Sequence, residues 1–327
     1  MKLKSAWIPF VLSFFAIMGL RIYQILSIGN PSVRTQWDDF EMICFIIATA
    51  AFGVIMIMSY ISSDAPNVFV IKKNQLLVLT SVITAIFIAI VSVFDILAYL
   101  REKSDWLKLA SGIAGLWMFV ALLFVAVSYL KEKNCFSSYK LFALIPTIYV
   151  FLYLLQLFFK YNSIPTDFVS VSNAFEAVTL LFFFFAQARL FVGIFNAATF
   201  KKLFYFGLSA VLFLTVNLTH ALATTMDLGR KLSADSIISI VAKCFLIIYI
   251  VNVIAAIKTG KNFVIEESSA DANDEPSTEN YAENDSNQAD SEESYLQTDM
   301  SEVDKLIEDI KNETAINKVS VRDDLAN

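Results

Sequence analysis

Eight long apolar runs dominate this sequence and restrict the folds that it can adopt. An α-helix rises about 1.5 Å per residue, so about 20 residues cross the roughly 30 Å hydrocarbon core of a bilayer. Each run has at least 19 residues, and no connecting loop is long enough to form a domain. The sequence therefore predicts an all-α fold, a polytopic membrane bundle of eight transmembrane helices within residues 1–261. The runs span residues 6–28, 40–61, 76–100, 108–130, 141–159, 174–195, 203–225 and 237–257.

The first run could be mistaken for a secretory signal peptide, because Lys2 and Lys4 precede it. It is longer than the apolar region of a signal peptide, contains Arg21 and Gln24, and leads into a turn-forming Gly-Asn-Pro segment. We therefore predict a retained first helix.

Two pairs of small residues predict close contacts between helices. Thr49 with Gly53, and Ser111 with Gly115, are four residues apart in the second and fourth runs. Such spacing places both members of a pair on one face of a helix, where a neighbouring backbone can approach closely.

The chain changes character after the last apolar run. Residues 262–327 contain 19 Asp and Glu against 4 Lys and Arg, a net charge of −15, whereas the remainder of the chain carries +9. A segment with little apolar surface and a high net charge cannot offset the entropy lost on ordering. We predict a disordered acidic tail on a basic membrane body, and we expect no nucleic-acid partner.

One segment of the tail, residues 301–313, has the pattern of a short amphipathic helix. Ser301 can cap its start, and four apolar residues then recur at i, i+3, i+4 and i+7 on one face. This face is a candidate docking site for a cytoplasmic protein partner. The alternative is a transient helix without a partner, because isolated short helices are marginal in water. The four residues are Val303, Leu306, Ile307 and Ile310.

The distribution of Lys and Arg favours both termini in the cytoplasm. If the N-terminus lies inside, the inner segments carry more basic residues than the outer ones. The compact loops and the lack of a cleavable signal favour a bacterial plasma membrane as the location.

Polar residues inside the apolar runs mark the predicted functional region. Ionisable groups in hydrocarbon are costly, so they usually face a bundle interior or a wet cavity. Helical spacing places the polar groups of four runs on stripes, and their ionisable members fall in the same outer leaflet. We predict an outward-opening polar pocket in which Asp95 or Glu176 is the counter-ion of Lys243. Its candidate residues are Asp95, Glu176, Gln187, Asn217, His220 and Lys243.

A structural role is the alternative for these residues. Polar side chains also hold membrane helices together, at about 0.6 kcal/mol per interaction. Arg189 lies on the side of its helix away from Gln187, in the inner half. It is a candidate contact for an anionic lipid headgroup, and the alternative is that its long side chain simply reaches the interface.

The sequence lacks the usual motifs of catalytic and metal sites. A single histidine excludes a multi-histidine metal site, and no nucleophile elbow, P-loop or dinucleotide fingerprint occurs in the right context. The cysteines Cys44, Cys135 and Cys244 form no C-x-x-C pair. We expect no enzymatic activity and no cofactor.

The leading interpretation is a sensor or receptor-like protein, or a membrane scaffold subunit, that recruits a cytoplasmic partner through its tail. The alternative is a small-solute or ion transporter that uses the polar pocket. Polar substitutions in the docking face should impair a sensor, whereas neutralising Asp95 or Lys243 should impair a transporter.

Overall fold

The computed structural model describes residues 3–26, 37–62, 71–102, 106–137, 139–161, 168–194, 196–227 and 234–258, and these contain helices but no strand. The predicted tail, including its docking face at residues 301–313, lies outside the described residues. The 3-10 helices are η1 (Leu3–Ala6), η2 (Cys135–Ser137) and η3 (Lys140–Leu144). The α-helices are α1 (Trp7–Leu26), α3 (Trp37–Ile61), α4 (Gln75–Glu102), α5 (Trp106–Lys131), α6 (Ile145–Tyr161), α7 (Phe168–Val192), α8 (Ala197–Asp227) and α9 (Ala234–Lys258).

Each of these eight α-helices of the described chain contains most of a span that is long and apolar enough to cross a membrane. This fits an integral multi-pass membrane protein and confirms the all-α prediction. Large apolar side chains such as Leu12, Phe15 and Phe158 are exposed on the outside of the bundle, where lipid would surround them.

Two helices begin earlier than the apolar runs suggest. α7 begins at Phe168 rather than near residue 174, and α8 begins at Ala197 rather than near residue 203. The first turns of α7 contain Ser170 and Ser172, which are polar but buried. Hydropathy alone excludes such residues from a span, although neighbouring helices shield them from lipid.

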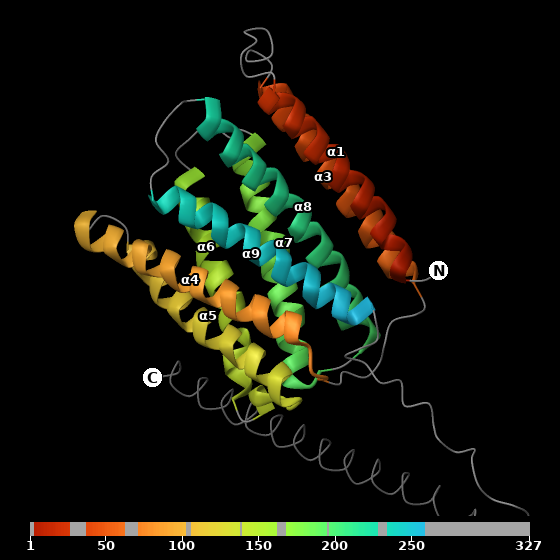
Figure 1. The fold of residues 1–327 in the computed structure, drawn as a ribbon, viewed down its shortest axis with the longest axis vertical. Helices are drawn as coiled ribbons and strands as arrows, with labels where there is room; N and C mark the ends of the chain where they lie inside the picture. Colours follow the sequence, from red (N-terminus) through yellow and green to blue (C-terminus); the bar gives the residue numbers. More distant parts are fainter. Residues whose placement is uncertain are drawn as a thin grey trace, which may run out of the picture. The chain divides into compact units, whose positions relative to one another are not determined.

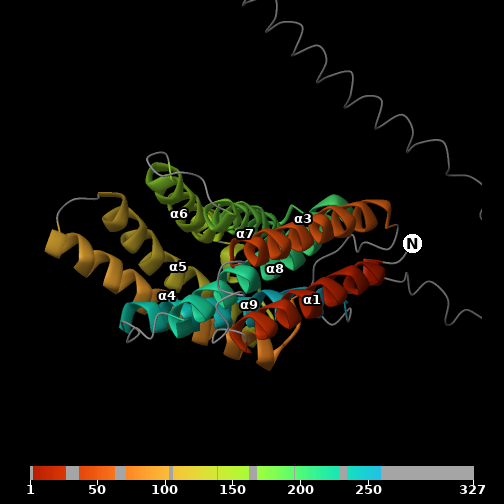
Figure 2. The same cartoon turned by 90° about the horizontal axis from the view of Figure 1, so that it is seen from above.

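Six of the helices form a closed ring. Each helix from α4 to α8 packs against the next one in sequence, and α9 packs against both α8 and α4. The remaining pair, α1 and α3, pack against each other and against α8 (Figure 1 and Figure 2). Most of α8 is buried as a result, because it has neighbours on both sides.

Glycine allows the closest approach between α4 and α5. A Cβ atom added at Gly115 would collide with Ser92 Oγ and lie 3.0 Å from the Tyr149 ring. The predicted close contact at Gly115 is therefore present. The one at Gly53 is not, because a Cβ atom there would have no atom within 4 Å.

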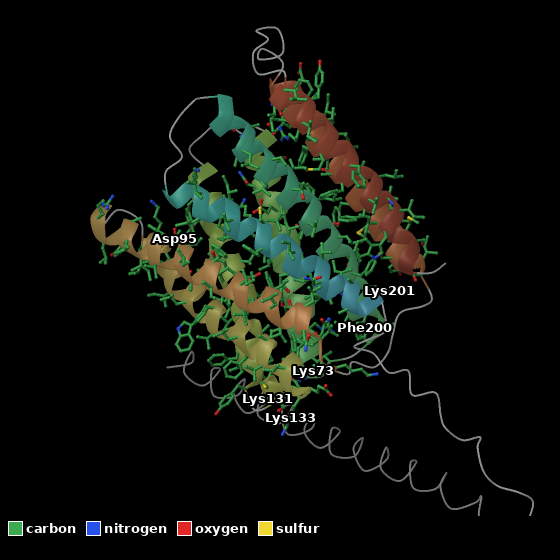
Figure 3. The ribbon with its side chains drawn as sticks, viewed as in Figure 1. Lys73, Asp95, Lys131, Lys133, Phe200 and Lys201 are labelled. Carbon is green, nitrogen blue, oxygen red and sulfur yellow. The ribbon has the colours of Figure 1, made fainter. Side chains whose placement is uncertain are left out.

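Four lysine side chains mark one end of the bundle. Figure 3 shows Lys73, Lys131, Lys133 and Lys201 together at one end, and Asp95 toward the other. We call the end with these four lysines the lysine end. The buried ionisable groups described below lie in the opposite half.

Candidate functional site

Glu176 of α7 is the centre of the first polar cluster. Its side chain is 2% exposed, and Lys243 Nζ of α9 lies 2.9 Å from its Oε1 and 3.0 Å from its Oε2. Asn217 of α8 donates a hydrogen bond of 2.5 Å to Oε2. Glu176 is therefore the counter-ion of Lys243, one of the two possibilities predicted from the sequence. Its two partners offset the cost of burying a carboxylate.

A central cavity of about 240 Å³ lies beside this ion pair. It lies within the ring, and every one of the six ring helices contributes at least one lining residue. One lining residue from each of α4 to α9 is, in order, Asp95, Met118, Tyr149, Glu176, Leu214 and Lys243.

A second cavity of about 440 Å³, here called the flanking cavity, lies between α4, α8 and α9. Asn217 contributes to its wall, together with Phe94. The central and flanking cavities share Val91, Asp95, Ser239 and Lys243. Asp95 and Lys243 therefore border both cavities, whereas Glu176 borders the central one.

One side of the central cavity was not predicted from the sequence. Tyr149, Tyr153 and Gln156 of α6 line it. Gln156 also donates to Leu107 O at 2.8 Å and to Ser111 Oγ at 2.6 Å, which joins α6 to α5. The signal for this face was present, because the three residues recur at i, i+4 and i+7 in an otherwise apolar run.

A second polar cluster, which was not predicted from the sequence as a cluster, lies between α1, α3 and α8. Arg21 is 1% exposed and binds Glu41 through two contacts, Nη1 to Oε1 at 2.6 Å and Nη2 to Oε2 at 2.7 Å. Arg21 Nη1 also donates to Gln24 Oε1 at 2.7 Å. His220 Nδ1 lies 2.6 Å from Glu41 Oε1. A neutral imidazole with its proton on Nδ1 would donate to Glu41 and keep the cluster at zero net charge.

Two of the six residues predicted to share one pocket lie elsewhere. Gln187 donates to Tyr249 Oη and borders a void of only about 10 Å³. It lies eleven residues from Glu176, which is close to three turns, so the two share a face but differ in depth by about 16 Å. His220 binds Glu41 instead, because α8 packs against the α1–α3 pair as well as against its neighbours in the ring. The other four residues line at least one of the two cavities.

Arg189 is half-buried in the C-terminal part of α7. Its Nε atom is buried and has no hydrogen-bond partner among the described residues. The contact with an anionic lipid headgroup remains a prediction. The part of the chain that the structure describes contains no group of three or more His, Cys, Asp or Glu residues placed to hold a metal ion.

Comparison of the chain with protein-family models, with curated proteins and with solved structures found no match. The function is therefore argued from the geometry of the site.

Proposed function

We propose that this protein is a membrane receptor-like sensor that holds a small polar solute in the central cavity. The observation that carries the proposal is that all six ring helices line this cavity. A solute bound there contacts the whole ring, so a difference in its affinity for two arrangements of the ring would shift the balance between them. The volume of about 240 Å³ lies just below the range that holds drug-sized ligands, which favours a smaller solute.

The close packing inside the ring toward the lysine end supports a sensor over a transporter. Phe183, Phe191 and Tyr249 are buried there, and the void beside Gln187 measures about 10 Å³. The polar cavities and the packed aromatic region thus occupy different depths of the ring. A binding site that is closed toward one membrane face suits a receptor.

The output of the proposed sensor is the C-terminal segment. Ser239 and Lys243 of α9 line the cavities, and the acidic residues 262–327 follow this helix in the sequence. The docking face on Val303, Leu306, Ile307 and Ile310 would bind a cytoplasmic protein. We place both termini in the cytoplasm of a bacterial plasma membrane, with the lysine end inward, because basic residues favour that side.

A comparison of two variants with the full-length protein tests the sensor. One combines Val303→Asp, Leu306→Asp and Ile310→Asp, and the other is Asp95→Asn. Quantitative affinity purification from membranes should recover a partner that the triple variant loses and whose amount Asp95→Asn changes. The sensor proposal is overturned if the same partners, in the same amounts, accompany all three proteins.

A small-solute transporter is the second candidate. It is favoured by Asp95 and Lys243, each of which borders both cavities, so a solute moving between the cavities would meet the same two charges. For a transporter, proteoliposomes should take up solute, and Asp95→Asn or Lys243→Met should abolish the uptake. The triple variant of the docking face should leave uptake unchanged.

A further inference from the structure

We propose that the outer face of the bundle carries, at the lysine end, a binding site for one phospholipid with a net negative headgroup. Arg189 of α7 and Lys202 of α8 bind the lipid phosphate, and exposed phenylalanines beside them hold an acyl chain. The inference goes beyond the proposed function, because it concerns the outer face of the bundle and not the cavities. It adds a second cation and an apolar surface to the contact predicted for Arg189.

An apolar stripe on the outer face of α7 ends at Arg189. Val178, Phe182 and Phe185 are exposed. Arg189 continues their spacing, so the four residues stand at i, i+4, i+7 and i+11 on one face of the helix. Gly193, with φ at 98°, follows the last residue of α7, so Arg189 lies about one turn from the helix end. The cation therefore stands where an apolar, lipid-facing stripe approaches the end of its helix.

The guanidinium of Arg189 has no anion in the part of the chain that the structure describes. Its Nε atom is buried without a hydrogen-bond partner, and no ion pair of the described residues includes it. Asn134, which follows Lys133, donates to Phe191 O at 2.7 Å and so places the last turn of α7 at the lysine end.

Simple extension of the Arg189 side chain into water does not account for its buried Nε atom. The Cα–Cβ bond of a helical residue tilts toward the helix N-terminus, and the N-terminus of α7 is opposite the lysine end. The side chain of Arg189 therefore starts back along the apolar stripe, away from the nearer interface. A charged group in such a position is stabilised by a counter-ion, and a lipid headgroup can supply one from outside the bundle.

Lys202 supplies a second cation from the neighbouring helix. Phe206 of α8 stacks on Phe182 of α7, with ring centroids 4.8 Å apart. Lys202 is exposed and lies about one turn before Phe206, on the same face of α8. Arg189 lies about two turns after Phe182 on the antiparallel α7. Both cations are therefore beyond the stacked pair toward the lysine end, where one phosphate can contact both long side chains.

The chemistry of this face matches an anionic phospholipid. A guanidinium binds a phosphate through two parallel hydrogen bonds, and the ammonium group of Lys202 adds a compact positive charge. Phe182 and Phe185 offer an exposed apolar surface to an acyl chain, which free phosphate lacks. Lys201, the next residue along, also lies at the lysine end (Figure 3). The cationic group of a zwitterionic lipid would meet this additional positive charge, so a net negative headgroup is favoured.

Lipid binding to the full-length protein tests the site. Protein stripped of lipid in detergent would be titrated with phosphatidylglycerol or with phosphatidylcholine of the same acyl chains, and native mass spectrometry would give the dissociation constant of each successive lipid. We expect the first phosphatidylglycerol to bind at least about tenfold more tightly than the first phosphatidylcholine. Lys202→Met and Arg189→Met should each weaken this first binding by about fivefold or more.

Two further variants and a competitor control the test. Lys73→Met removes another exposed lysine of the lysine end, just before α4, and should leave the first binding unchanged. Lys202→Glu reverses a charge at an exposed position, so it should abolish the preference for phosphatidylglycerol even if Arg189→Met fails to fold. Inorganic phosphate in large molar excess should not displace the lipid, because it has no acyl chain.

Each contrary result overturns the inference in a recognisable way. Equal binding of the two lipids would exclude a site for a negative headgroup. A loss with Lys73→Met as large as that with Lys202→Met would show a diffuse attraction to the lysine end. Phosphatidylglycerol binding that Lys202→Glu leaves unchanged would place the lipid elsewhere, and displacement by inorganic phosphate would exclude a lipid as the specific occupant. The sensor proposal is judged separately by its partner assay.

Discussion

Two buried glutamates organise the polar interactions of the bundle at the scale of single residues. Glu41 is held by Arg21 and His220, and Glu176 is held by Lys243 and Asn217. Removing one member of a buried ion pair leaves an uncompensated charge, whereas replacing both members with apolar residues is often close to neutral.

We predict that Arg21→Met lowers the free energy of unfolding by about 3–5 kcal/mol, because Glu41 is then buried without its cation. Adding Glu41→Leu should recover much of this loss. The measurement is unfolding of the purified protein in detergent by a denaturing surfactant. Ile22→Met, at an exposed position on the same helix, is the matched control. A double variant no more stable than Arg21→Met would show that the two residues are not coupled.

His220→Phe should have a smaller effect than Arg21→Met. The imidazole is 25% exposed, and Arg21 still binds both oxygens of Glu41 after its removal. The expected loss is about 1 kcal/mol, the usual net contribution of one hydrogen bond. The same unfolding assay measures it, and a loss as large as that of Arg21→Met would contradict this account of the cluster.

At the scale of whole helices, packing depends on where small residues face a neighbour. Gly115→Val places new atoms against Ser92 and Tyr149, so we expect it to cost about 1–3 kcal/mol through overpacking. Gly53→Val adds the same atoms at a helix position with open space around it. Thermal unfolding of both variants compares them. Equal losses would contradict the close α4–α5 contact.

The positions of the helices along the chain can be predicted well from the sequence. Which helices pack against each other cannot. The apolar runs determine eight spans because span length depends only on local composition. Which helices meet is a tertiary property, and this is why the Arg21–Glu41 pair was not assigned to a site. Glu41 lies in the first turns of α3, where an acidic residue also suits a headgroup contact.

Two predicted pocket residues lie outside the pocket because of their depth in the bundle or the direction in which their side chains point. Gln187 lies on the predicted face of α7 but at another depth, and His220 faces α3 because α8 has neighbours on both sides. The Glu176–Lys243 pair was within reach of sequence reasoning, since both residues are charged and fall in the same leaflet. The aromatic wall of α6 was missed because tyrosines in an apolar run resemble ordinary packing residues.

At the scale of the whole molecule, one turn of α8 joins the two polar clusters. Val216 O accepts from Arg21 at 3.5 Å, Asn217 donates to Glu176, and His220 contacts Glu41. A displacement of this turn would therefore change both clusters together. The α1–α3 pair and the ring are thus linked through charged groups as well as apolar packing.

We predict that Arg21→Met and Lys243→Met are not additive. Each substitution leaves a glutamate buried without its cation, and both glutamates contact the same turn of α8. The first substitution should therefore already displace this turn, and the second should then cost less. The interaction free energy should exceed about 0.5 kcal/mol in a double-mutant cycle of unfolding. Additivity within about 0.3 kcal/mol would show that the clusters are independent.

The accessibility of position 239 shows whether a solute can enter a cavity inside the ring. Ser239 lines both cavities, whereas Ser209 is fully buried in α8 and serves as the control. The two variants Ser239→Cys and Ser209→Cys would be made in a protein in which Cys44, Cys135 and Cys244 are replaced. Each variant protein would then be treated with a membrane-impermeant thiol reagent in oriented vesicles. We predict that the Ser239→Cys protein reacts, from the side opposite the lysine end, while the Ser209→Cys protein does not. If the Ser239→Cys protein is as unreactive as the control, no solute reaches the cavity, and its polar groups only hold the helices together.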